Sequence, residues 1–236
     1  MPVATRSCVP VCARGSLERS GKPPCTGDLL RVSRYKNKMS AKEIVFASTN
    51  DAKVREARDV CRSLGYHVLD LRGLSRQIGF EEQFDVLETE LSYEGNARAK
   101  ARAYASLLGR PCISDDTGLE IIALGGLPGV HTARFGIQRV SSMLLPEYRY
   151  DAEFVCCVSY AEPTGRSVSV TSRLEGYICF PREVSDLRTG LPFSTYFFPR
   201  GESETMEALS ARGGFLTHRG RAIRDLITSI SENYSS

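Results

Sequence analysis

The sequence predicts an α/β protein with a mixed β-sheet, and three observations support this prediction. From residue 42 onward, apolar strand patterns alternate with amphipathic helix patterns, which is typical of domains that contain parallel strands. Two long strand patterns follow in the middle of the chain, joined by a short turn, as in an antiparallel pair. At 236 residues, the chain has the length of one domain, or of one domain with an appendage.

The first half of the domain is expected to alternate strands and helices. Residues 43–48 have the unbroken apolar pattern of a buried strand. The next segment has Val54, Ala57 and Cys61 on one helical face and ends at Gly65, a residue type that often terminates helices. The further elements expected here are a strand at 66–71, an acidic and polar connection at 72–92, a helix at 93–108 and a short strand at 111–114.

The second half is expected to contain the antiparallel strands. Residues 153–160 and 167–177 carry the two long strand patterns, and Pro163-Thr164-Gly165 supplies the turn between them. A short strand is expected at 195–198. A final helix is expected at 221–230, where Ile223 and Ile227 belong to an apolar stripe.

Residues 1–40 differ from the rest of the chain and are assigned to a leader, with the domain at 41–236. They lack apolar periodicity and carry eight Lys or Arg against two acids, a net charge of +6, which leaves −3 for the remainder of a chain whose total is +3. An Arg-rich, acid-poor leader fits organellar targeting by residues 1–38. The alternatives are a disordered leader or a segment upstream of the true start at Met39, and the location expected for the protein is the cytoplasm.

Composition argues against several classes of protein. A mildly acidic domain argues against a nucleic-acid partner, which needs a basic face. No apolar run is long enough to span a membrane, so no membrane role is expected. The eight cysteines include no CxxC pair and only three His accompany them, so we expect buried thiols and no structural zinc.

Two segments at predicted helix starts carry residue types that suit an anion. Thr49, Asn50 and Lys53 follow the first strand, where a helix N-terminus offers unpaired N–H groups and the positive end of a dipole. An ordinary capped helix with a solvated lysine is the plainer alternative. In the second segment, Asn96 and Lys100 are four residues apart and share one helix face, which could equally be a solvated face.

The tandem acids Asp115 and Asp116 follow the short strand predicted at 111–114. Acidic residues before a glycine are common in exposed turns. Carboxylates at the end of a strand also suit Mg²⁺, which takes few protein carboxylates and completes its shell with water and phosphate oxygens. Glu88 could join them. Near the C-terminus, His218 and Arg219 could contact a base or a phosphate, or be charged neighbours of a cap at Thr217.

The order and spacing of these segments resemble the inosine triphosphate pyrophosphatase family, whose members act on ITP, dITP and XTP. The resemblance covers roughly residues 43–231. The family's TxNxxK loop is matched by Thr49, Asn50 and Lys53, its glutamate and FxENAxxKA helix start by Glu88, Tyr93, Asn96, Ala97 and Lys100, its DDSGLxVxALxGxPGxxSARY segment by residues 115–135, and its SHRxxAL segment by residues 217–223.

The resemblance implies an elongated mixed β-sheet flanked by helices, Mg²⁺-dependent hydrolysis of a nucleoside triphosphate to monophosphate and pyrophosphate, and a homodimer. Carried over by position, Asp116 would be the general base, supported by Asp115 and Lys100, and Glu88 and Asp116 would hold the metal. The substrate would be bound by Thr49, Asn50, Lys53, Lys100 and Thr117 at its phosphates, and by Phe193, Ser194, His218 and Arg219 near its base.

The chain departs from the family's pattern in the segments that recognise the base. Phe193 and Ser194 stand where the family has a tyrosine and an acid, Pro192 replaces a glycine, and Gly213 replaces a lysine. Phe193 can still stack on a base. Three interpretations follow: the family's usual purine preference, an altered or relaxed choice of base, or a nucleotide-binding paralogue with little turnover.

Overall fold

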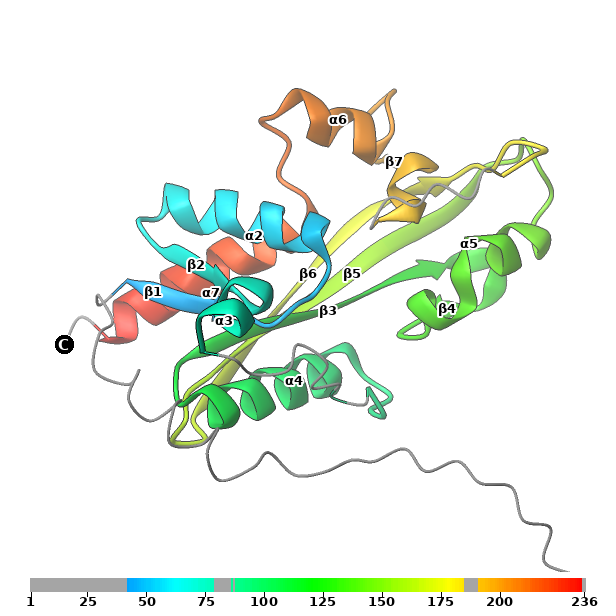
Figure 1. Cartoon of the computed structure of the whole chain (residues 1–236). Helices are drawn as coiled ribbons and strands as arrows, with labels where there is room; N and C mark the ends of the chain where they lie inside the picture. The colour runs from blue at the N-terminus through cyan, green and yellow to red at the C-terminus, as the bar shows by residue number, and fades with distance from the viewer. Residues whose placement is uncertain (1–41, 79–85, 87, 185–190, 235–236) are drawn as a thin grey trace, which may run out of the picture.

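The computed structural model describes residues 42–78, 86, 88–184 and 191–234 (Figure 1). The predicted leader at residues 1–40 lies outside these residues. In chain order the elements are β1 (Glu43–Phe46), α2 (Asp51–Ser63), β2 (His67–Asp70), α3 (Leu71–Ile78), α4 (Tyr93–Leu108), β3 (Cys112–Ile121), β4 (Pro128–Gly129), α5 (Thr132–Ser142), β5 (Tyr150–Ala161), β6 (Ser167–Ile178), β7 (Phe197–Pro199), α6 (Met206–Arg212) and α7 (His218–Tyr234).

The sheet is mixed, as the sequence predicts. Its strand order is β2-β1-β3-β5-β6-β7, with β4 paired to β3 beside this path. The strand β1 runs parallel to β2 and β3, whereas the pairs β3–β5, β5–β6 and β6–β7 are antiparallel. Figure 1 shows β3, β5 and β6 running diagonally through the molecule, so that they connect one end built on β1 and β2 with another built on β4 and β7. The α/β class and the helix-flanked mixed sheet are confirmed.

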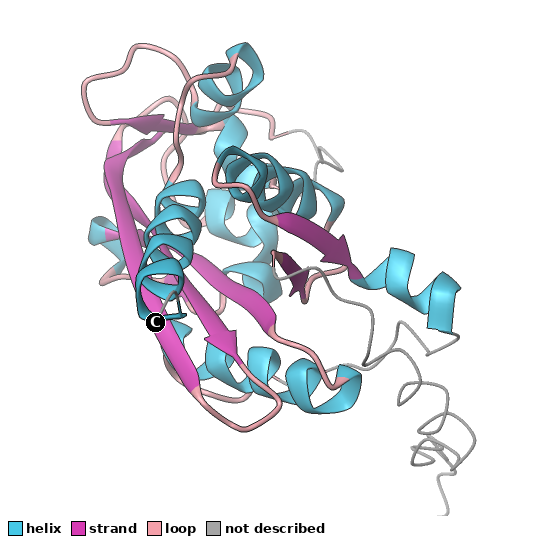
Figure 2. Ribbon diagram, turned by 90° about the vertical axis from the view of Figure 1, so that its left-hand side faces the viewer, coloured by secondary structure: helices cyan, strands magenta, loops and turns pink. Residues whose placement is uncertain are grey.

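Helices lie on both faces of the sheet (Figure 2). Ile44 and Phe46 of β1 belong to a core cluster with α2 and α7, whereas Val45 and Ala47 belong to a cluster with α4. Because successive side chains of a strand point to opposite faces, α2 and α7 cover one face and α4 covers the other. A third cluster joins the far halves of β5 and β6 to α5, β7 and α6.

The strand that carries the tandem acids is longer than predicted. The expected strand at 111–114 continues as β3 to Ile121, so Asp115 and Asp116 lie inside a strand and not at its end or in a turn. They stand opposite Val158 and Cys157 of β5 in unbroken antiparallel register. An acid pair normally signals the end of a buried strand because carboxylates resist burial. Here that expectation was wrong.

Other boundaries differ for reasons of tertiary packing. The helix predicted at 93–108 has those bounds, whereas the connection predicted at 72–92 contains most of α3, whose Leu71 and Leu74 are buried. The short strand expected at 195–198 is β7, displaced to Phe197–Pro199 after a 3₁₀ turn at Pro192–Thr195. The sequence analysis did not predict α5 or α6. In the part of the chain that the structure describes, no helix is long and apolar enough to cross a bilayer.

The start of α4 provides a test of the capping that fixes this helix. Ser92 is its N-cap and accepts a hydrogen bond from the Gly95 N–H at 3.1 Å. We expect Ser92→Ala to lower the free energy of unfolding by about 1 kcal/mol in urea denaturation, since one helical N–H loses its acceptor. Ser142→Ala is the control, because this exposed hydroxyl donates to the Arg139 carbonyl at 2.8 Å without capping a helix start. Equal losses in the two variants would contradict the capping role.

Candidate active site

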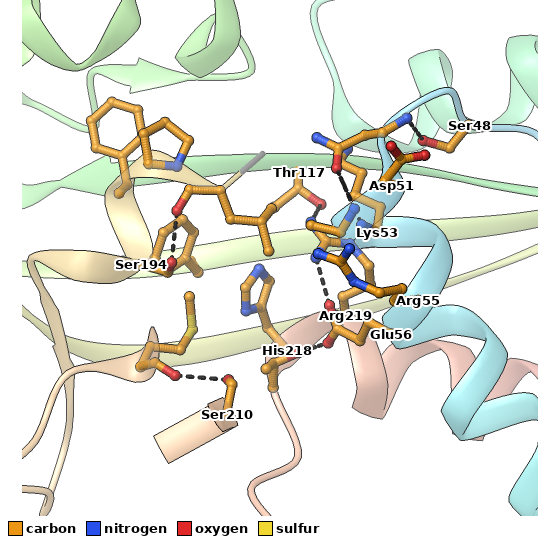
Figure 3. A pocket seen from close by; sticks show the side chains of 18 of the residues that line it. Ser48, Asp51, Lys53, Arg55, Glu56, Thr117, Ser194, Ser210, His218 and Arg219 are labelled. Carbon is orange, nitrogen blue, oxygen red and sulfur yellow. Dashed lines mark hydrogen bonds and ion pairs between the residues drawn. The ribbon is translucent and has the colours of Figure 1, made fainter. Parts of the chain in front are cut away.

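A cleft of about 1980 Å³ lies along the sheet and is lined by residues from both of its ends. The lining comes from the β1–α2 junction, the starts of α5 and α7, and the segment before β7. Figure 3 shows part of this lining, with Lys53, Thr117, Ser194, His218 and Arg219 around one space. The volume exceeds the roughly 300–1000 Å³ of common small-molecule sites, so the cleft has room for a ligand with several distinct parts.

The N-terminus of α2 supplies both a cap and a partly buried cation, Lys53. The Asn50 side chain accepts hydrogen bonds from the N–H groups of Ala52 and Lys53, at 3.0 and 3.2 Å. The ordinary cap weighed in the sequence analysis is therefore present. The lysine is not simply solvated, however, because its Nζ lies 2.9 Å from Asp115 Oδ2. Thr49 lines the cleft beside them.

On the other face of the sheet, α4 brings an amide and a second lysine to the same region. Asn96 Nδ2 donates to Asp116 Oδ2 at 2.9 Å, and Asn96 Oδ1 accepts from the Glu90 N–H at 3.0 Å. Lys100 Nζ donates to Glu88 Oε1 at 2.5 Å and to the Asp115 main-chain carbonyl at 2.6 Å. The face shared by Asn96 and Lys100 is thus packed against the tandem acids and is not a solvated face.

The two tandem carboxylates point in opposite directions. Asp115 contacts Lys53 from α2 and Arg219 from α7, whereas Asp116 contacts Asn96 from α4. This follows from the alternation of side chains along β3. Their mutual repulsion is reduced because the sheet separates them, which explains how adjacent acids are both buried, at 2% and 5% exposure.

Asp115 is the centre of a buried ionic cluster. Its Oδ2 lies 3.0 Å from Arg219 Nε and also accepts from Thr117 Oγ1 at 2.9 Å. Burial by itself would raise the pKa of Asp115, but Lys53 and Arg219 outweigh it and hold the pKa well below its ordinary value. The carboxylate therefore stays ionised and bound, which suits it to fixing its neighbours and not to accepting a proton.

Asp116 has the opposite tendency. Burial raises the pKa of its carboxyl, and the nearby Glu88 raises it further, against the lowering effect of Lys100 and the Asn96 hydrogen bond. A buried carboxylate with a raised pKa has the properties of a general base. The geometry thus separates the roles of two acids that are adjacent in the sequence.

Glu88 and Asp116 are the two carboxylates of this region that could hold Mg²⁺. Within the described residues, no group of three or more His, Cys, Asp or Glu side chains gathers as a metal site. Two carboxylates can nevertheless hold Mg²⁺, which draws its remaining ligands from water and phosphate, and Glu88 lies near enough to Asp116 to raise the pKa of its carboxyl. Lys100 donates its hydrogen bond to Glu88 Oε1 and not to Glu88 Oε2.

The first residues of α7 have separate roles. The His218 ring is 2% exposed and stacks on Phe154 at a centroid distance of 4.8 Å and an interplanar angle of 10°. Among the residues that the structure describes, neither of its nitrogens has a hydrogen-bond partner, and its ring lies among the residues of the cleft (Figure 3). Burial and the Arg219 charge hold the pKa of His218 well below its ordinary value, so the ring is neutral.

Arg219 does not share the environment of His218, although the sequence analysis placed both near a base. Its Nη1 lies 2.7 Å from Glu56 Oε2, and its Nη2 donates to Thr117 Oγ1 at 3.3 Å. With the Asp115 contact, the guanidinium is bound to two acids on the ionic side of the cleft. It therefore organises charges and is not directed toward the aromatic side.

The segment before β7 forms the opposite, aromatic wall. Phe193 is buried in the third core cluster and still lines the cleft. Ser194 Oγ donates to the Leu191 carbonyl at 2.6 Å, so its proton is used within the turn. Gly213 also lines the cleft, with a φ of 78°, and offers no side chain there.

The sequence analysis missed two polar residues of the cleft. Glu56 binds Arg219 and also accepts a hydrogen bond from Thr217 Oγ1, so it joins α2 to the start of α7. Its spacing of three from Lys53 was a usable signal, since such residues share a helix face. Arg134 at the start of α5 donates to the Glu88 main-chain carbonyl. Nothing local in the sequence indicates that contact.

Comparison with known proteins identifies relatives over most of the chain. The Ham1 family model matches residues 44–229. The dITP/XTP pyrophosphatase of Exiguobacterium sibiricum is 30% identical over 201 residues, which cover 80% of this chain and 97% of that protein. The dITP/XTP pyrophosphatase of Bacillus subtilis is 32% identical over 197 residues, which cover 78% and 95%.

Solved structures give the same result. The Staphylococcus aureus Ham1 protein is similar with a TM-score of 0.61 and 30% identity, covering 81% of this chain and 99% of that one. A HAM1 protein from Coxiella burnetii has a TM-score of 0.62 and 25% identity, covering 80% and 98%. The resemblance carried by the sequence segments is thereby confirmed, and the chain belongs to the Ham1 family.

Proposed function

We propose that this chain hydrolyses purine nucleoside triphosphates with deaminated bases, such as ITP, dITP and XTP, to the monophosphate and pyrophosphate. The observation that carries the proposal is that Lys53 from α2 and Lys100 from α4 both contact Asp115, and that Lys100 also binds Glu88. Cations beside carboxylates that suit a metal are what a polyphosphate site needs. The names of the relatives support the choice of substrate.

In the proposed reaction, a water molecule attacks the α-phosphorus and the bond to the bridging oxygen of the leaving pyrophosphate breaks. Asp116 accepts the proton of that water, and Asn96 fixes its carboxylate by the hydrogen bond to Oδ2. Lys53 and the N-terminus of α2 stabilise negative charge on the phosphates. Mg²⁺ held by Glu88 and Asp116 would polarise the water and neutralise phosphate charge.

The base is proposed to lie between Phe193 and His218, away from the ionic cluster. A neutral imidazole with two free nitrogens can donate one hydrogen bond and accept another. A purine with a 6-oxo group offers an acceptor and an N–H to such a ring. Because Ser194 uses its proton locally and Gly213 has no side chain, recognition depends more on His218 and stacking, which favours an altered or relaxed choice of base as the second candidate.

A homodimer in the cytoplasm, with residues 41–236 as the enzyme domain and 1–40 as a leader, completes the proposal. Light scattering on the purified chain tests the dimer. Mass spectrometry of the N-terminus of the native protein tests whether residues 1–38 are retained.

Replacing the proposed base should abolish turnover without unfolding the protein. We expect Asp116→Asn to lower kcat for ITP by at least about a hundredfold, because the amide cannot accept the proton of the attacking water. Pyrophosphate release with Mg²⁺ is the measurement. Glu94→Gln is the control, since this acid lies on the exposed part of α4 and pairs only with Arg98 among the described residues. Full activity in Asp116→Asn, with thermal unfolding unchanged, would overturn the assignment of the base.

A panel of nucleotides separates the interpretations of base choice. We expect ITP and XTP to be hydrolysed with kcat/KM about tenfold or more above ATP. A site that forms hydrogen bonds to a 6-oxo base leaves its own polar groups unpaired when adenine binds. Comparable values for all bases would favour relaxed specificity. Binding of ITP without release of pyrophosphate in Mg²⁺ would reject the enzymatic proposal and leave a nucleotide-binding paralogue.

The buried neutral His218 should make stability depend on pH. Its pKa is lower in the folded chain than in the unfolded chain, so below about pH 6.5 the unfolded chain binds a proton that the native ring does not. The free energy of unfolding of the wild type should therefore fall as the pH drops through that value. We expect a smaller fall between about pH 7.5 and pH 5.5 in His218→Gln, measured by urea denaturation. Equal falls in both proteins would show that His218 is not kept neutral.

A further inference from the structure

A second hollow borders the cleft on the far side of the β1–α2 junction. It has a volume of about 280 Å³ and is formed by the start of α2, the end of β2 and the helix α3. Ser48, Thr49, Asp51 and Arg55 line both this hollow and the cleft. The two spaces are therefore neighbours across one short stretch of chain, the stretch that the proposed triphosphate would contact.

The charge of this hollow is strongly unbalanced. Four arginines line it against two acids. Asp70 Oδ2 lies 2.7 Å from Arg58 Nη2, and Asp51 accepts two hydrogen bonds from Arg72 Nη1 at 2.8 and 2.9 Å. Each acid therefore has an arginine partner, and two further guanidinium groups remain.

Arg55 and Arg76 supply the excess positive charge. Neither forms an ion pair with any residue that the structure describes, and both are exposed. The one side-chain hydrogen bond of Arg76, from Nε to the Arg72 carbonyl at 3.2 Å, leaves its Nη atoms available. Arg55 is also visible at the edge of the cleft in Figure 3. Like charges that gather at a hollow without neutralising partners favour an anion there.

The shape and chemistry of the hollow restrict the anion. Guanidinium groups bind phosphate oxygens in a bidentate manner, and two of them match the oxygens of a diphosphate better than a single small anion. The volume of 280 Å³ is about a seventh of that of the cleft, which suits a small inorganic anion.

We propose that this arginine hollow, defined by Arg55, Arg58, Arg72 and Arg76, is an accessory binding site for inorganic pyrophosphate. It would receive the leaving group as it moves from Lys53 across the β1–α2 junction. The identification of the anion as a reaction product rests on the proposed function. The existence of an oligophosphate site in the hollow does not rest on the proposed function, because it depends only on the charges and the volume of the hollow.

Calorimetric titration of pyrophosphate into the full chain tests the proposal. We expect two pyrophosphate sites per chain in the wild type. The Lys53→Ala/Lys100→Ala variant should retain one, because the loss of both lysines weakens pyrophosphate binding in the cleft. In that background, adding Arg55→Ala/Arg76→Ala should weaken the remaining site by about tenfold or more, because charge-assisted hydrogen bonds are lost. Adding Arg62→Ala/Arg224→Ala is the matched control. It removes the same charge from exposed positions outside the hollow, and binding should be unchanged.

Three results would overturn the site: a single pyrophosphate per wild-type chain, equal weakening by the control pair, or sulfate binding as tightly as pyrophosphate. Failure of the proposed function is distinguishable from these. If no nucleotide of the panel is hydrolysed but Arg55→Ala/Arg76→Ala still weakens pyrophosphate binding, the anion site is supported and its role in product release is rejected. If turnover is normal and the arginine pair has no effect, the site falls alone.

Discussion

The burial of Asp115 is the constraint on which the rest of the structure depends. An ionised carboxylate inside a sheet is tolerated only when charge and hydrogen bonds compensate for lost water. Lys53 and Arg219 provide that compensation, and they belong to α2 and α7, near opposite ends of the described chain. The requirement therefore fixes two helix starts against one strand. Glu56 extends the cluster, because it forms a second ion pair with the Arg219 guanidinium.

This cluster also gives the cleft its polarity. Charged groups gather where α2, α4 and β3 meet, whereas neutral His218, Phe154 and Phe193 form the wall toward β7. His218 and Arg219 are adjacent in the sequence and lie on the two sides of this division. The Arg219 charge helps keep the His218 ring neutral, so the ionic half contributes to the chemistry of the aromatic half. A ligand with a charged and an aromatic part has one favourable orientation in such a cleft.

The parts of the fold that the sequence predicted are those with local signals. The helix α4 has its predicted bounds because Ser92 caps its start and Gly109 takes the left-handed conformation at its end. Asn50 caps α2 for a similar local reason. The length of β3 could not be predicted, since it depends on cations from distant segments. The stacking of His218 on Phe154 and the contact of Arg134 with Glu88 are tertiary pairings that leave no local trace.

The balance of charge around the tandem acids bears on how the proposed substrate and metal bind. The contacts around Asp115 and Asp116 join three cations and four acids: Lys53, Lys100 and Arg219 with Glu56, Glu88, Asp115 and Asp116. With all groups ionised, the net charge of this cluster is −1. Such a site attracts a free divalent cation weakly, and Lys100 already binds one Glu88 oxygen. A free triphosphate would meet two ionised acids. A metal–nucleotide complex would avoid both costs, because Glu88 and Asp116 would hold the metal and the lysines would bind the remaining phosphate oxygens. The charge arrangement therefore favours binding of the complex over either ion alone.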